Sequence, residues 1–298
     1  MPLFFAGGNT GTTENVGLLR GEMYPLTDTA GRARDLLILD CPMLRGLRKV
    51  EGAYVTRALG WDDLLEAVKI ASPSSAVVVQ PFMEPGETRA DSRLADLLDA
   101  ARLIPVVAVV PFQSAYTGAV RTMLDQGVTD VADAALELTP AAIRPRLHAV
   151  HAQPLKQLVE PALSRFVSAN ARTIIRAAAE VTVDGGTAVD LGDVFRSTER
   201  TVSGWCAREA LPQPRRLLAW LRLILALALL EAPHRSVARA AMGAGYSFDY
   251  ALRRAIKDML GGTAPPRERT VTEALNAFSA ELRALRDKRR KQGHAGEE

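Results

Sequence analysis

Cysteine and long apolar runs are both scarce in this sequence. The 298 residues include two cysteines, Cys41 and Cys206, whose separation predicts neither a disulfide framework nor a paired metal-ligand spacing. This usage is typical of the reducing cytoplasm, where we expect the protein to act. Residues 1–8 lack cations and hold only a short apolar run, so we expect no signal peptide. The apolar run at 217–230 is about 14 residues long and contains Arg222, which predicts a buried helix and no membrane partner.

Aromatic residues and net charge are also low. Aromatics make up 5%, but apolar residues make up 48%, and the length allows about two domains with packed cores. The net charge is only +3 and is unevenly distributed. Residues 186–298 hold 19 Lys and Arg against 13 Asp and Glu, whereas residues 1–185 hold 18 against 21. This division favours an electrostatic footprint confined to the carboxyl half, although chance variation in surface charge explains it equally well.

Apolar segments alternate with amphipathic helical patterns through the first 150 residues. Strands are predicted at 36–39, 53–59, 75–80, 104–110 and 128–131, and helices at 61–70, 91–102, 115–126 and 140–150. Strands that are apolar throughout indicate a parallel sheet covered on both faces. We therefore expect a doubly wound α/β domain over 33–150. Residues 1–32 are rich in Gly and Thr, and we expect them to form a flexible arm.

Over residues 53–133 this order resembles the receiver domain of response regulators, through Ile104-Pro105-Val106 and the Gly127 to Asp130 segment. The resemblance implies a flavodoxin-like sheet and a phosphoryl-accepting Asp after the third strand. Gln80 stands there instead, Val110 replaces the family's Thr or Ser, and a residue near Asp133 replaces its Lys. Without that carboxylate we expect neither an acyl phosphate nor a magnesium site, since Asp40 alone cannot hold the ion. The resemblance therefore implies a degenerate, non-phosphorylatable receiver.

Helical patterns dominate the rest of the chain. Apolar residues at 155, 158, 159, 163, 166 and 167 predict a helical connector over 151–168, and a helix over 171–183 would open the next domain. Two helix-turn-helix patterns follow, joined by a long apolar helix at 215–231. In the first, Thr198 is a good N-cap for a helix through Arg208, after a scaffold helix at 190–195. Val202 and Cys206 would face inward.

The second pattern is the sharper one. Residues 236–244 predict a short helix, 245–247 a turn, and 248–260 a helix with Leu252, Ala255, Ile256 and Met259 on one buried face. Arg253, Arg254 and Lys257 lie off that face. A small helix pair with cations on the outer face of its second helix suits a major groove.

The segments LLAWLRL at 217–223, SVARAA at 236–241, GYS at 245–247 and ALRRAIK at 251–257 resemble the DNA-binding domain of AraC/XylS-type transcription regulators. The resemblance covers about residues 165–269. It implies an all-α domain at 169–270 in which two helix-turn-helix units contact adjacent major-groove segments of double-stranded DNA. The base-facing positions that it implies are Arg200, Ser203 and Gly204 in the first unit and Tyr250, Ala251 and Arg254 in the second, with Arg208, Arg253 and Lys257 near phosphates.

Gly204 lacks the long side chain that the family often places there, so we expect the first unit mainly to position the protein on phosphates. A basic tail over 271–298 would be a solvated helix from Thr272 that adds non-specific phosphate affinity. Its cations are Arg283, Arg286, Lys288, Arg289, Arg290 and Lys291.

No catalytic constellation is recognisable. The i, i+3 spacing of His148 and His151 would suit half of a metal site, but no third ligand is near them in sequence. Residues 7–11 lack the Lys of a P-loop. We therefore expect no enzyme activity, cofactor or metal. The sequence favours a DNA-binding transcription regulator that forms a homodimer through its amino half and recruits or blocks RNA polymerase. Two alternatives stay open: an adaptor whose cationic helices bind an acidic partner, and an enzyme with a site near Gln80 and Val110.

Overall fold

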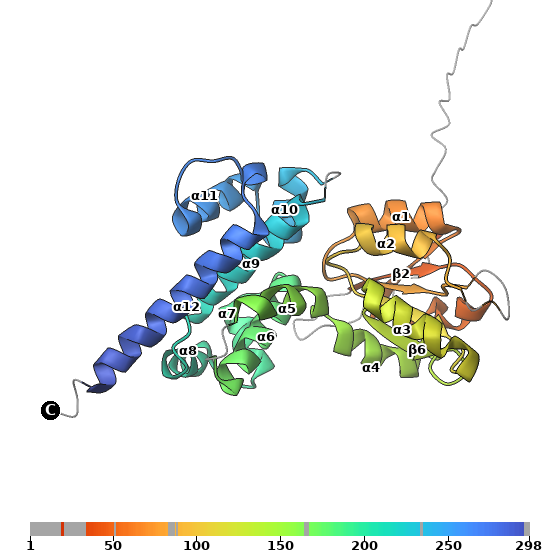
Figure 1. Cartoon of the computed structure of the whole chain (residues 1–298), viewed down its shortest axis with the longest axis horizontal. Coiled ribbons are helices and arrows are strands. Elements are labelled where there is room, and N and C mark those ends of the chain that lie inside the picture. Colours follow the sequence, from red (N-terminus) through yellow and green to blue (C-terminus); the bar gives the residue numbers. More distant parts are fainter. Residues whose placement is uncertain are drawn as a thin grey trace, which may run out of the picture.

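The chain folds into an α/β half followed by a helical half, as expected (Figure 1). The computed structural model describes residues 19–20, 34–50, 52–82, 87, 89–163, 167–232 and 235–294. The arm predicted for 1–32 lies outside these residues except for Leu19–Arg20, which forms strand β1.

Five parallel strands form the centre of the amino half. They are β2 (Arg34–Leu39), β3 (Ala53–Ala58), β4 (Ala76–Val79), β5 (Val106–Val110) and β6 (Asp130–Asp133). The order in the sheet is β1-β3-β2-β4-β5-β6, and β1 pairs antiparallel with β3 at the edge. The predicted strand at 128–131 begins two residues late. The Val128 amide is still bonded to Met123 in the cap of the preceding helix, where Gly127 adopts a left-handed conformation.

Helices cover both faces of the sheet, which confirms the layered arrangement. One face packs against α1 (Trp61–Ile70), α2 (Arg93–Ala100) and α3 (Thr117–Gln126), which follows the short 3-10 helix η2 (Ser114–Tyr116). The other face packs against the 3-10 helix η1 (Met43–Arg48) and α4 (Pro140–Val150). Alternate residues of one strand enter the two cores: Leu37 and Leu39 join the first, and Leu36 and Ile38 join the second.

The helical half is built around one long apolar helix, α9 (Pro214–Leu230), which is buried along most of its length. The elements around it are α5 (Gln153–Val159), η3 (Glu160–Ala162), α6 (Ala169–Val183), α7 (Ala188–Val194), α8 (Glu199–Arg208), α10 (Val237–Gly243), α11 (Asp249–Leu260), η4 (Pro266–Glu268) and α12 (Val271–His294). A helix that is apolar all round must be buried on every side, which makes α9 the centre of this half.

The predicted connector is shorter and better packed than expected. Its α-helix ends at Val159, because Pro161 has no amide hydrogen with which to continue the helix. Leu155, Val159 and Leu163 join the core that α6 and α9 form, so the segment belongs structurally to the helical half. Residue 166, which the pattern included, lies outside the described residues.

The prediction that α12 is solvated from its start was wrong. Val271, Ala274, Phe278 and Leu282 are buried at helical spacing. The rings of Phe278 and Trp220 lie 5.9 Å apart, so α12 packs along α9. The cations that suggested a solvated helix all follow Leu282, and only that end of α12 leaves the core.

Candidate nucleic-acid interface

The second helix pair, α10 and α11, presents a cationic surface. Ser236 caps α10 by accepting a hydrogen bond from the Arg239 amide at 3.2 Å. Gly245 makes the turn with a φ of +82°, a conformation that favours glycine. Leu252 and Ile256 fix the inner face of α11 against the core. The opposite face of α11 is therefore turned to solvent.

The outer face of α11 carries most of the side chains that the resemblance implies. Arg253, Arg254 and Lys257 are exposed, and Tyr250 is 70% exposed. Ala251 is half-buried. The Nε atom of Arg254 lies 3.6 Å from an Asp258 carboxylate oxygen, and Arg253 has a similar contact with Asp249 at 3.4 Å. Exposed pairs of this kind contribute only about 0.3–0.5 kcal/mol, so either guanidinium can exchange its carboxylate for a stronger acceptor.

The first helix pair, α7 and α8, forms through close backbone packing. Thr187 and Asp190 make a capping box at the start of α7, with the Thr187 amide donating to the carboxylate at 2.6 Å. A Cβ on Gly192 would lie 2.7 Å from the Ser197 carbonyl oxygen, so only glycine allows α7 to pass this close to the turn. Thr198 then caps α8, as predicted, by accepting from the Thr201 amide at 3.2 Å.

The outer face of α8 has few long side chains. Val202 and Cys206 are buried, as predicted, and burial raises the pKa of the Cys206 thiol to about 11. Arg200 and Arg208 are exposed, and Ser203 is half-buried. Gly204 is exposed, and a Cβ there would have no atom within 4 Å. The middle of α8 therefore offers an open surface without a long side chain.

A partly buried arginine of α9 joins the two helix pairs, and sequence reasoning missed this contact. Arg222 donates through Nη2 to the carbonyl oxygen of Gly186, just before α7. A Cβ on Gly245 would lie 3.5 Å from both Arg222 and Gly185, so the turn of the second pair packs on the entrance to the first. Burial lowers the pKa of Arg222 and raises that of Tyr246, beside it, to about 12. This contact fixes how the two pairs are placed.

The second helix pair also contacts the amino half. Arg235, immediately before the cap of α10, is buried and donates through Nη2 to the carbonyl oxygens of Ala71 at 3.1 Å and Val68 at 3.4 Å. Those carbonyls are at the carboxyl end of α1, where the helix dipole favours a cation. Arg267 donates to the carbonyl oxygen of Arg235 at 2.6 Å and holds it in place.

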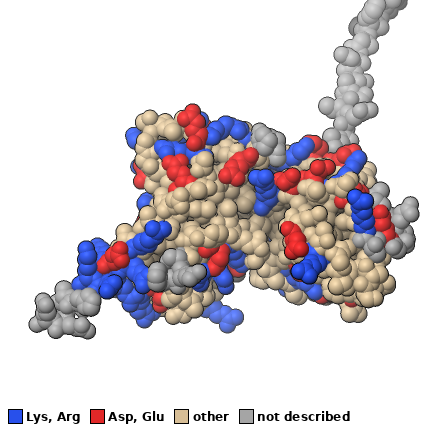
Figure 2. Space-filling view, in the orientation of Figure 1, with Lys and Arg blue, Asp and Glu red and all other residues tan. Residues whose placement is uncertain are grey.

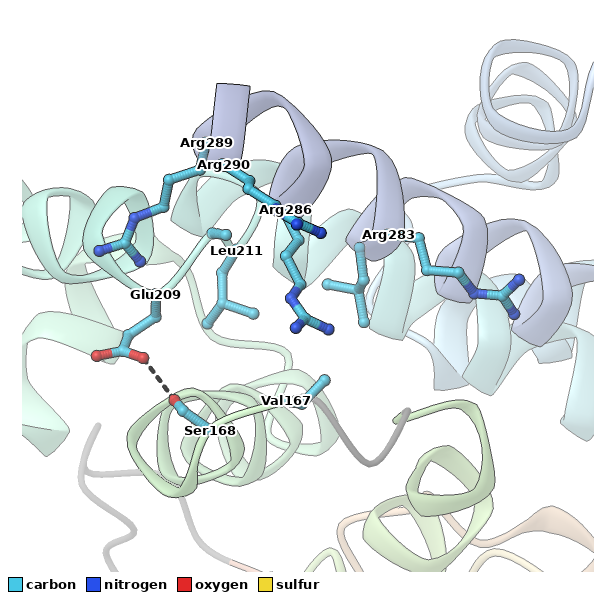
Figure 3. A pocket seen from close by; sticks show the side chains of 10 residues that line it. Val167, Ser168, Glu209, Leu211, Arg283, Arg286, Arg289 and Arg290 are labelled. Atoms are coloured by element: carbon cyan, nitrogen blue, oxygen red, sulfur yellow. Dashed lines mark hydrogen bonds between the residues drawn. The ribbon is translucent and has the colours of Figure 1, made fainter. Parts of the chain in front are cut away.

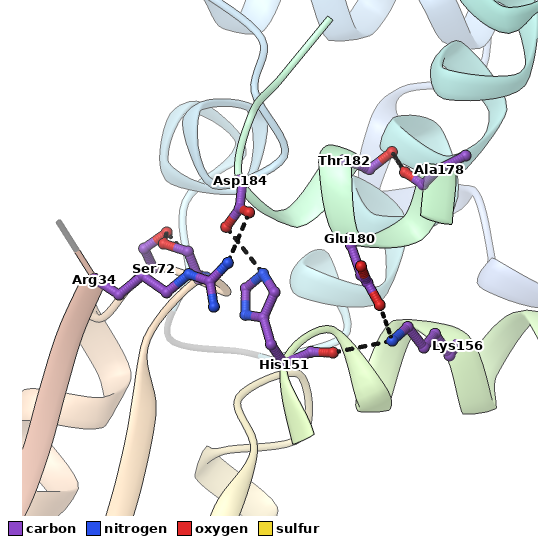
Figure 4. A network of polar contacts seen from close by, with 9 residues as sticks. Arg34, Ser72, His151, Lys156, Ala178, Glu180, Thr182 and Asp184 are labelled. Carbon is purple, nitrogen blue, oxygen red and sulfur yellow. Dashed lines mark hydrogen bonds and ion pairs between the residues drawn. The ribbon is translucent and has the colours of Figure 1, made fainter. Parts of the chain in front are cut away.

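A buried polar network ties the amino half to the approach to α7 (Figure 4). Asp184, at the end of α6, pairs with Arg34 of β2 at 3.0 Å, and its other oxygen lies 2.9 Å from Nε2 of His151. Burial alone would raise the pKa of Asp184, but hydrogen bonding and charge from His151 and Arg34 outweigh it, and the pKa lies below its ordinary value. Burial, together with the charge of Arg34, lowers the pKa of His148.

This network also accounts for the two histidines that were weighed as half of a metal site. His151 is directed at Asp184. Within the described residues, no three side chains of the types that bind metals lie close enough together to hold an ion.

The carboxyl edge of the sheet is where receiver domains bind phosphoryl groups. Asp40 there is paired with Arg57 from the end of β3, a partner that sequence reasoning did not find. Gln80 follows β4 and is half-buried, and the amide of Asp133 donates to Glu137 at 2.8 Å. Burial alone would raise the pKa of Glu137, but the Asp133 amide and Arg146 lower it below the ordinary value. At this edge of the sheet, the Asp40 carboxylate is therefore already paired with the Arg57 guanidinium.

Comparison with models of known protein families, with curated protein sequences and with solved structures finds no significant match. Among the helices in the described part of the chain, none is both long enough and apolar enough to cross a membrane.

Proposed function

We propose that this chain is a sequence-specific regulator of transcription that binds double-stranded DNA through α8 and α11. The observation that carries the proposal is the arrangement of the helical half. Two short helix pairs pack on one apolar helix, and the second helix of each pair has exposed cations on its outer face. An α-helix fits the major groove, and phosphates attract the cations around it.

The two helix pairs have different tasks in this proposal. Arg254 bonds the two acceptors of a guanine, and Tyr250 and Ala251 contact neighbouring bases. Arg253 and Lys257 bind phosphates beside them. The first pair orients the protein through Arg200 and Arg208, since Ser203 and Gly204 offer little to distinguish one base from another. Arg222 keeps the pairs at a fixed spacing, which two adjacent groove segments require.

The amino half is a receiver-like control and dimerisation module in this proposal, and no catalysis is assigned to it. Counted along the chain, its five parallel strands have the spatial order 2-1-3-4-5, which is that of flavodoxin-like sheets. Gln80 occupies the position of the family's phosphoryl-accepting Asp, and Asp40 is already paired with Arg57. Dimers would bring two copies to paired half-sites and recruit or block RNA polymerase.

The test compares Arg254→Ala with Lys257→Ala on full-length protein, using the best duplex selected from a random pool and a scrambled duplex. Arg254→Ala should weaken the selected duplex by about 1–3 kcal/mol and relax preference at one base pair. Lys257→Ala should weaken both duplexes alike and reduce the dependence of log K on log salt by about 0.9. Arg121→Ala, an exposed cation on α3, is the matched control. Equal losses on both duplexes for Arg254→Ala would refute base contact by this residue.

A second candidate function is that of an adaptor that binds an acidic protein. The observation favouring it is a pair of exposed aromatic rings, Phe248 and Tyr250, beside the cations of α11, because aromatic and arginine side chains are enriched at protein interfaces. Binding of a duplex with a defined, salt-dependent footprint distinguishes the two functions in favour of DNA.

A further inference from the structure

The far end of α12 is a cationic segment of helix. The helix runs antiparallel to α9, since Glu281 pairs with Arg216 at 3.0 Å and accepts from Trp220 at 2.7 Å, both near the start of α9. At about 1.5 Å per residue, residues 283–294 continue for roughly 18 Å past that point. Residues 283–291 hold six Lys and Arg and one Asp. We call residues 283–291 the basic end; in Figure 2 its cations gather at lower left.

The basic end leaves the core beside the first helix pair. A cleft of about 400 Å³ lies there, between α12, the end of α8 and the start of α6. Its lining includes Arg283, Arg286, Arg289, Arg290, Leu211 and Glu209. Figure 3 shows Arg286 and Arg289 extending from α12 toward the segment that holds Leu211 and Glu209. The Glu209 carboxylate accepts a hydrogen bond from the Ser168 hydroxyl at 2.5 Å.

The distribution of side chains on the basic end decides what it can bind. Six cations within nine residues of a helix point in all directions around its axis, so about half can face any one surface. Leu285 is its single apolar residue larger than alanine, and an interfacial membrane helix needs a continuous apolar face. A rod of positive charge without an apolar face is complementary to another rod of opposite charge, which the backbone of a nucleic-acid duplex provides.

We propose that the basic end of α12 binds the phosphate backbone of duplex DNA that flanks the segment contacted by α8. It thereby supplies affinity that α8, with an open surface at Gly204, does not provide. This inference rests on the proposed function. It adds a third DNA-contacting element, beyond the two helix pairs, that extends the footprint on one side only and carries no sequence preference.

The test uses full-length protein in which Lys288, Arg289, Arg290 and Lys291 are all changed to Gln. These side chains are exposed, so the unfolding midpoint and the circular dichroism should not change. The matched control changes four exposed arginines of the amino half, Arg45, Arg48, Arg89 and Arg121, to Gln. Both variants lose the same charge, so a difference between them reports position and not net charge.

If about two of the four cations contact phosphates, the slope of log K against log salt falls by about 1.8, which is roughly 60-fold weaker binding at 0.1 M salt. Preference between the selected and scrambled duplex stays unchanged. Protection of the DNA backbone from hydroxyl radicals disappears in the segment that flanks the contact of the first helix pair and persists elsewhere. The control keeps the wild-type slope and protection.

Other outcomes separate the two proposals. Wild-type protein that binds no duplex contradicts the proposed function itself. Wild-type protein that binds duplex, with the α12 variant and the control showing equal slopes, overturns the role of the basic end alone. A variant that keeps its duplex affinity but loses binding to single-stranded RNA, to anionic vesicles or to an acidic protein also overturns it, in favour of that other partner.

Discussion

Gly204 is inside helix α8 although nothing around it requires glycine. A Cβ there would have no atom within 4 Å. Glycine is about 0.8–1 kcal/mol less favourable than alanine in a helix interior, because the unfolded chain has more conformations to lose. Gly204→Ala should therefore stabilise the protein by about 0.5–1 kcal/mol and raise its unfolding midpoint by about 1–3 °C.

Gly192 provides the matched comparison in the same helix pair. A Cβ there would lie 2.7 Å from the backbone oxygen of Ser197, so α7 and α8 must move apart to accommodate it. Gly192→Ala should destabilise by about 1–3 kcal/mol. Urea unfolding followed by tryptophan fluorescence and circular dichroism measures both variants. A loss of stability on Gly204→Ala would refute the open outer face of α8, on which the interpretation of the first helix pair depends.

Position 204 also allows a test of DNA binding. Gly204→Arg introduces a long cation at a position that faces the groove in the proposed function. It should raise duplex affinity several-fold and increase the salt slope by about 0.9, since one phosphate contact is gained. Reduced duplex affinity in a normally folded Gly204→Arg protein would show that this face of α8 has no room beside DNA.

Three further outcomes are expected. The pKa of Asp184 is lower in the folded chain than in the unfolded one, so its contribution to stability is present above about pH 4 and is lost as pH falls through the folded value. Asp184→Asn should be less stable at pH 7 and lose less between pH 5 and 3, as urea unfolding at each pH would reveal. Incubation with a small phosphoryl donor and magnesium should leave the intact mass of the protein unchanged, because Gln80 stands where a phosphoryl-accepting Asp would be. An acid-labile adduct in the amino half would contradict this expectation. A fragment of residues 151–298 should fold, sediment as a monomer and bind duplex more weakly, whereas one beginning at residue 160 lacks Leu155 and Val159 and should be several kcal/mol less stable. Equal stability of the two fragments would argue against that packing.

Local patterns were sufficient to predict most of the elements. The helix at 61–70 was predicted with the bounds that it has, and α9 begins and ends within one residue of the prediction. Thr198 caps α8 as expected, because an N-cap depends on residues three positions apart. The same locality accounts for the errors. Helix α12 contains both the buried Phe278 and the basic end, and its charge pattern alone did not predict that its first half is buried.

Contacts between distant segments were not predictable. Arg34 and Asp184 are 150 residues apart, and Arg235 binds carbonyls more than 160 residues away. A buried arginine has the same letter in the sequence as an exposed one, and no periodicity identifies its partner. The partner of Asp40 was missed for a similar reason, because Arg57 occupies a strand that is otherwise mostly apolar. Of the candidate interface, the sequence could predict the exposed side chains of α11, but not the Arg222 contact that places α11 relative to α7.

The junction between the two halves contains both apolar and polar contacts. The apolar cores of the amino half and of the helical half are separate clusters, although Leu103, which precedes α4, packs on the helical core. Pro73 of the amino half also lies close to Gly243 of α10. The polar contacts across the junction include Arg34 with Asp184, Arg235 with the end of α1, and an exposed approach of Arg102 to Glu231 at 3.9 Å. The exposed approach of Arg102 to Glu231 contributes little net free energy, because both charges remain in water. The Arg34–Asp184 contact precedes α7 and the Arg235 contact precedes α10, so the amino half meets the helical half at the approach to each helix pair.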